Sequence, residues 1–153
     1  MLNGGVIYCA GDMLAALIQT QFDWRRMLGF LIVGATLYAF EVPNWFRWID
    51  EKTANMEGLK ASLAKTGLAI AYFNPLWIAR HLFFILLFSG KVHDVTADLF
   101  RIAALSFVVN IPVSICANYL IQNVVKLKWR FLASALFSGI MAVYFAMSAS
   151  WFA

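Results

Sequence analysis

Five long apolar stretches make up almost the whole chain, and they constrain its fold more than any other feature. They cover residues 3–22, 27–49, 59–89, 102–125 and 131–153. A helix needs about 20 apolar residues to cross a bilayer. Only 13% of the residues are charged and 63% are hydrophobic, whereas about a quarter of a soluble domain is charged. The sequence therefore predicts an all-α integral membrane helical bundle of four to five transmembrane helices, in a single domain over residues 1–153.

Polar breaks separate these stretches. Residues 50–58 form the most polar part of the chain and are expected to be an exposed loop. Asn74 and Pro75 interrupt the third stretch, where proline removes a helical hydrogen bond. Residues 92–101 carry charged side chains at helical spacing and predict an interfacial helix. Barrel strands are excluded because the stretches are too long and do not alternate polar with apolar residues.

Basic residues lie at the ends of the stretches, where they set orientation. If all five stretches cross, one side carries Arg47, Lys52, Lys60, Lys126, Lys128 and Arg130. The other side carries Arg25, Arg26, Lys91 and Arg101. This asymmetry favours an N-terminus on the inside, unless the fourth or fifth stretch is only half-inserted. No basic stripe interleaved with aromatic residues is present, which argues against a nucleic-acid partner.

Several ionisable residues fall at membrane depth, where they usually pair or line a wet cavity. They are Asp12, Glu41, Lys65, Arg80 and His81. From depth alone, we expect Glu41 to reach Lys65, and Asp12 to reach Arg80 or His81. These residues either fix helix register as structural pairs or, together with Asn118, line a selective path for solutes or protons.

The fifth stretch carries small residues every four positions along one face: Ser134, Ser138, Ala142, Ala146 and Ser150. Helices associate in lipid through such close backbone approach. We expect this helix-packing ridge to receive a neighbouring helix of the bundle, or alternatively a second copy of the chain.

The chain contains no nucleophile–base set, phosphate loop or HExxH-like motif. Its two cysteines, Cys9 and Cys116, lie in separate apolar stretches and are expected to be reduced thiols. We therefore expect no enzymatic activity, no cofactor and no metal site.

The order and spacing of several short motifs resemble the Mpv-seventeen/peroxisomal-membrane-protein family of small integral membrane proteins. In the first half these motifs are Gly11-Asp12, Asp23 with Arg26, Gly34 and Trp45-Phe46-Arg47-Trp48-Ile49-Asp50. In the second half they are Lys65, Asn74-Pro75, Gly90, Pro112, Asn118-Tyr119, Arg130 and Tyr144. The chain departs from the family pattern at Ala16, Ala39-Phe40, Ala69-Ile70, Ile111, Ile115 and Met141.

This resemblance implies a compact helical bundle that acts as a weakly selective channel or solute-homeostasis protein. It also implies residence in a bacterial cytoplasmic membrane, or in a mitochondrial inner or peroxisomal membrane. We thus expect a channel-like or transporter-like protein that passes small solutes, with the lipid bilayer as its surroundings.

Two alternatives remain open. The loss of polar family positions favours a structural or accessory subunit packed in a larger membrane complex, or a homo-oligomer. The short helical plan with a broken third helix is also similar to that of small bacterial amino-acid exporters.

Overall fold

Helices form every regular element in the described part of the chain, as the sequence predicts. The computed structural model describes residues 2–18, 20 and 22–151, without the side chains of residues 2–5, 142 and 145–151. The elements are α1 (Leu2–Ile18), α2 (Trp24–Val33), η1 (Gly34–Tyr38), α3 (Ala39–Lys52), α4 (Gly58–Tyr72), α5 (Pro75–Phe88), η2 (Val92–Asp94), α6 (Asp98–Asn123) and α7 (Leu127–Trp151). The all-α bundle predicted from the apolar stretches is confirmed.

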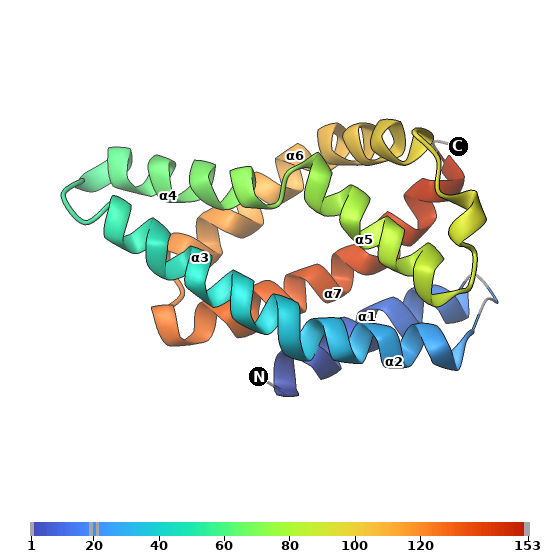
Figure 1. The fold of residues 1–153 in the computed structure, drawn as a ribbon. Helices are drawn as coiled ribbons and strands as arrows, with labels where there is room; N and C mark the ends of the chain where they lie inside the picture. The colour runs from blue at the N-terminus through green and yellow to red at the C-terminus, as the bar shows by residue number, and fades with distance from the viewer. Residues whose placement is uncertain (1, 19, 21, 152–153) are drawn as a thin grey trace.

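The second predicted segment is one long rod made of α2, η1 and α3 (Figure 1). It begins three residues earlier than expected, because the Asp23 carboxylate accepts a 2.8 Å hydrogen bond from the Arg25 amide and caps α2. In its middle, Gly34–Tyr38 widen into a π-helical turn. Pro43 follows inside α3 without ending it.

The third segment is interrupted at the position that the sequence indicates. The Asn74 side chain accepts hydrogen bonds from the amides of Leu76 and Trp77, at 2.8 and 3.2 Å, and so caps α5. Pro75 occupies the first helical position, where its missing N–H costs nothing. The chain therefore continues in the same general direction as two helices, α4 and α5 (Figure 1).

The interfacial helix predicted over residues 92–101 does not form as one helix. Val92–Asp94 make a single 3-10 turn, and Val95 is extended, with φ −73° and ψ 106°. The β-branched Val95 and Thr96 disfavour helix at this point. The remaining residues of the expected helix belong to the start of α6, which begins at Asp98.

Successive rods run in opposite directions (Figure 1), so the connections gather at two ends of the bundle. One end, named here the basic end, carries Lys52, Lys60, Lys126 and Lys128 in and next to the α3–α4 loop and the α6–α7 turn. The α1–α2 turn and the α5–α6 connection lie at the opposite end. The grouping of basic residues on two sides thus follows from the fold.

The first and last helices, α1 and α7, make the most extensive contact between any two described elements. Gly11 and Gly139 lie at this contact, and a Cβ atom added to Gly11 would lie 2.5 Å from the Gly139 Cα. The backbones therefore approach as closely as small residues in membrane helices allow.

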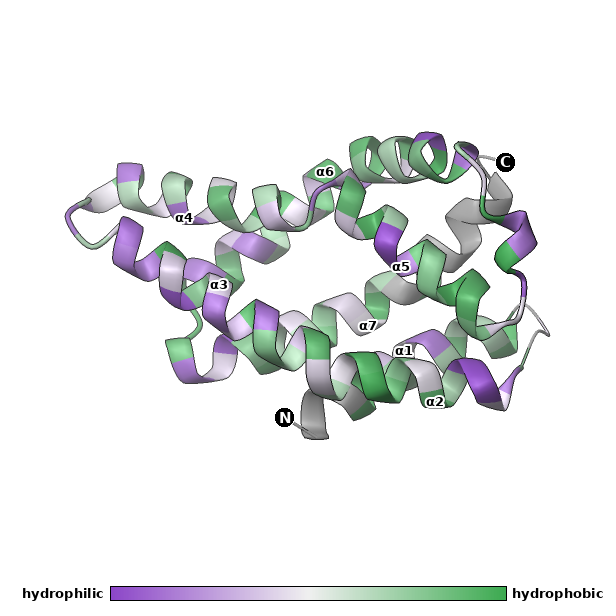
Figure 2. Ribbon diagram, in the orientation of Figure 1, coloured by the Kyte–Doolittle hydropathy of each residue, from purple (hydrophilic) through white to green (hydrophobic). Residues whose placement is uncertain are grey.

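Hydrophilic residues gather at the two ends, with isolated hydrophilic turns on α3 and α5 between them (Figure 2). Among the described residues, three helical rods are long and apolar enough to cross a membrane: Trp24–Lys52, Gly58–Phe88 and Asp98–Asn123. Val6–Ile18 is a shorter apolar helix. These rods indicate a membrane-embedded protein.

Candidate functional site

A line of buried polar side chains winds along α6. It comprises Ser106, Asn110, Ser114, Asn118 and Gln122, all less than 9% exposed. We call it the α6 polar stripe. Its members recur every four residues, so each lies about 40° further round the helix than the one before, and the stripe winds slowly about α6 over about 24 Å. The stripe therefore covers most of the roughly 30 Å hydrocarbon thickness of a bilayer.

Hydrogen bonds link the middle of the stripe. The Asn110 amide donates to the Ser114 hydroxyl at 2.8 Å, and the Asn118 amide donates to the Ser114 carbonyl at 2.9 Å. On the facing helix α7, Ser138 accepts a 3.3 Å hydrogen bond from the Tyr8 hydroxyl. Polar groups from three helices thus meet in the bundle interior.

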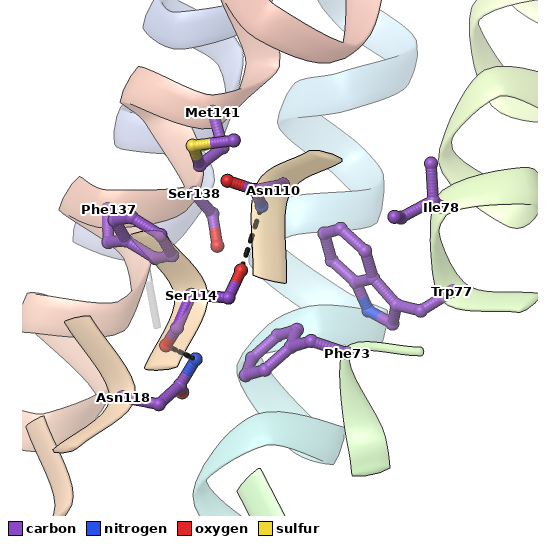
Figure 3. A pocket seen from close by; sticks show the side chains of 9 residues that line it. All are labelled: Phe73, Trp77, Ile78, Asn110, Ser114, Asn118, Phe137, Ser138 and Met141. Atoms are coloured by element: carbon purple, nitrogen blue, oxygen red, sulfur yellow. Dashed lines mark hydrogen bonds between the residues drawn. The ribbon is translucent and has the colours of Figure 1, made fainter. Parts of the chain in front are cut away.

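A small cavity opens beside these groups (Figure 3). Asn110, Ser114 and Asn118 line one side of it, and α7 contributes Phe137, Ser138 and Met141. Phe73, Trp77 and Ile78 close the opposite side. Its volume is about 20 Å³, which is room for a water molecule. The interior is therefore polar on one wall, apolar and aromatic on the other, and closed to larger molecules in this conformation.

At the basic end, the stripe meets a cluster of charges. The Asp50 carboxylate bonds to Lys65 Nζ at 2.9 Å and to Arg130 Nη1 at 2.8 Å. Arg130 also donates to the Val125 carbonyl at 3.0 Å and contacts Gln122 Oε1 at 3.4 Å. The cluster thus ties α3, α4 and α7 to the end of the polar stripe.

A second ion pair is fully enclosed between α1 and α2. Arg26 donates through Nε and Nη2 to the two carboxylate oxygens of Asp12, at 2.6 and 2.5 Å. The two side chains are 2% and 0% exposed. This fork-to-fork geometry is the strongest arrangement that arginine makes with a carboxylate.

A third group of polar side chains lies between α3 and α5. Arg80 forms two hydrogen bonds to Glu41, at 3.1 and 2.9 Å, and the Tyr72 hydroxyl donates to the same carboxylate at 2.8 Å. The Arg80 guanidinium also lies 5.3 Å from the centre of the Tyr38 ring. Unlike the Asp12 pair, Arg80 and Glu41 are 30% and 28% exposed.

The pairings expected from depth are therefore wrong. Asp12 pairs with Arg26 rather than with Arg80 or His81, and Glu41 pairs with Arg80 rather than with Lys65. Membrane depth specifies how far along a helix a residue lies, but not the direction in which it points. A long arginine side chain also carries its charge several ångströms from its own Cα.

His81 is buried between the rings of Trp77 and Phe30, whose centres lie 5.8 and 4.9 Å from its own. Of the six polar candidates from the sequence, Asn118 alone belongs to the α6 polar stripe. Ser106 and Ser114 are not among these candidates, because serine contributes little to a hydropathy profile. The four-residue spacing from Ser106 to Gln122 is the signal that identifies the stripe.

Two residues of the expected helix-packing ridge, Ser134 and Ser138, are buried on α7. Ala142, Ala146 and Ser150 lie outside the described side chains. Across the described residues, no group of three His, Cys, Asp or Glu side chains is placed to hold a metal ion.

Comparison of the chain with protein-family models, with curated proteins and with solved structures finds no match. The likeness to the Mpv-seventeen/peroxisomal-membrane-protein family therefore stays a prediction based on the residues of this chain.

Proposed function

We propose that this protein is a non-enzymatic, channel-like or transporter-like membrane protein that passes small polar solutes along the α6 polar stripe. The observation that carries the proposal is the continuous series of buried serine, asparagine and glutamine side chains over most of the membrane thickness. Polar groups are expensive inside a bilayer and commonly mark solute pathways there. The resemblance to the Mpv-seventeen/peroxisomal-membrane-protein family supports a bacterial cytoplasmic membrane, or a mitochondrial inner or peroxisomal membrane, as the host of this protein.

For a solute to pass, the aromatic side chains Phe73 and Trp77 on one wall of the cavity must move. In the closed conformation, Phe73 and Trp77 restrict the space beside Ser114 to that of a single water molecule. Pro112, inside α6, deprives the Val108 carbonyl of its helical hydrogen bond. Such a break is a natural hinge next to the stripe, and bending there separates α6 from α5.

Solute flux into proteoliposomes tests this function. We expect wild-type vesicles to take up water and glycerol faster than protein-free vesicles in a stopped-flow light-scattering assay. Ser114→Leu fills the cavity and abolishes the increase, whereas Val113→Leu adds bulk on the exposed face of α6 and leaves it intact. A wild-type rate equal to that of empty vesicles, or an unchanged rate in Ser114→Leu, would contradict the proposal.

The Glu41–Arg80 pair favours a second candidate function, that of an accessory subunit in a larger membrane complex. Glu41 lies 17 residues after the start and 11 before the end of the rod Trp24–Lys52, well inside the membrane. Charges that are about 30% exposed at this depth are costly against lipid, and a partner protein would cover them. Extraction in a mild detergent distinguishes the two roles, because a subunit co-migrates with a large assembly and a self-sufficient channel does not.

A further inference from the structure

A groove of about 300 Å³ lies between α3 and α7 at the basic end of the bundle. Its lining residues are Pro43, Phe46, Arg47, Leu127, Lys128 and Phe131. The middle turns of α3 and the first turns of α7 form its two walls. The groove is separate from the α6 polar stripe and shares no lining residue with the interior cavity.

The lining changes from charged to apolar with depth. Helix α3 runs toward the basic end, so Arg47 lies nearer the membrane surface than Pro43. Helix α7 starts at that end and runs inward, so Lys128 lies nearer the surface than Phe131. Both walls therefore place a cation at the outer part of the groove, beside Leu127 of α7, and only apolar side chains at its inner part.

The two cations are available to a ligand. Arg47 and Lys128 are both exposed, and neither forms a salt bridge with a described carboxylate. Arg47 donates one hydrogen bond to Asn44, which leaves most of its five donors unused. By contrast, Lys65 and Arg130 at the same end both form salt bridges with Asp50.

We propose that this groove binds one anionic phospholipid. Its phosphate would lie between Arg47 and Lys128, and an acyl chain would lie along Pro43, Phe46 and Phe131. The exposed Trp129 indicates that this end of α7 is at headgroup level, because tryptophan concentrates at that depth. Basic pockets between membrane helices are known to recognise anionic headgroups. A zwitterionic lipid fits less well, because its cationic group would face the same two positive charges.

Native mass spectrometry of the intact, detergent-purified protein tests the site. Phosphatidylglycerol and phosphatidylcholine with identical acyl chains are titrated against wild type, the variant Arg47→Gln/Lys128→Gln and the control Lys52→Gln/Lys60→Gln. The control removes the same charge from exposed positions at the same end but outside the groove. We expect the groove variant to lose about thirtyfold in phosphatidylglycerol affinity, since each surface cation contributes about fivefold, and the control to lose much less.

The proposal is overturned if wild type shows no preference for phosphatidylglycerol, or if the control variant loses as much affinity as the groove variant. Inorganic phosphate, added at millimolar concentration, separates a phospholipid site from a plain anion site. If phosphate alone displaces the lipid from wild type, the apolar part of the groove contributes nothing and the proposal fails. Circular dichroism of both variants establishes that the substitutions leave the fold intact.

Discussion

The buried pair between Asp12 and Arg26 yields the sharpest prediction about stability. Asp12→Ala leaves the Arg26 guanidinium without its carboxylate in a site where only 2% of its side chain is exposed. Removing one partner of a buried pair costs about 3–5 kcal/mol, or roughly two to three and a half orders of magnitude in the unfolding equilibrium. We therefore expect Asp12→Ala to unfold at a much lower SDS mole fraction than wild type, as followed by circular dichroism in mixed micelles.

Two matched variants make the test specific. Asp98→Ala removes a carboxylate from the exposed pair with Arg101, which should cost no more than about 1 kcal/mol. Asp12→Leu/Arg26→Met removes both buried charges and should recover much of the stability lost in Asp12→Ala, because no isolated charge remains. If Asp12→Ala costs no more than Asp98→Ala, or if the double variant is no more stable than Asp12→Ala, the reasoning from burial and pairing is refuted.

Two further changes test the packing of the bundle. Gly11→Ala places a Cβ 2.5 Å from the Gly139 backbone. It should lower the free energy of unfolding by about 1–3 kcal/mol, because the two helices are forced apart. Gly67→Ala meets no atom within 4 Å and should stabilise α4 by about 0.5–1 kcal/mol. A thermal scan in detergent that ranks the two alanines equally would count against the close crossing. Asp50→Asn breaks the salt bridges with Lys65 and Arg130. It should lower the unfolding temperature by several degrees more than Glu51→Gln, which changes the exposed neighbouring carboxylate. Equal shifts in the two variants would argue that the Asp50 salt bridges do not stabilise the bundle.

Much of the fold can be predicted from the sequence because few kinds of structure can cross a bilayer. Helix length must match membrane thickness, so the apolar stretches determine the rods, and Asn74-Pro75 determines the break between α4 and α5. Local chemistry explains the misplaced boundaries. The Asp23 cap starts α2 early, and the β-branched pair Val95-Thr96 prevents one continuous helix over residues 92–101.

The candidate site is harder to predict, because it depends on which helix faces which. Asn110 and Asn118 were recognisable as polar residues in an apolar segment, but their role depends on Ser114 between them and on Ser138 of α7. Ser138 lies beside the stripe because α6 and α7 pack against each other, a contact that no single segment encodes. The partners of the charged residues are set by the same long-range arrangement.

The close crossing of α1 and α7 also bears on how the molecule is made. The ribosome synthesises α1 before α7, so the Gly11 face of α1 contacts lipid or a chaperone until α7 is inserted. The hairpin of α1 and α2 can meanwhile hold itself together through the pair of Asp12 and Arg26. Docking of α7 against α1 is thus a later step than formation of the α1–α2 hairpin, and a nascent polypeptide halted before α7 would leave the Gly11 face of α1 uncovered.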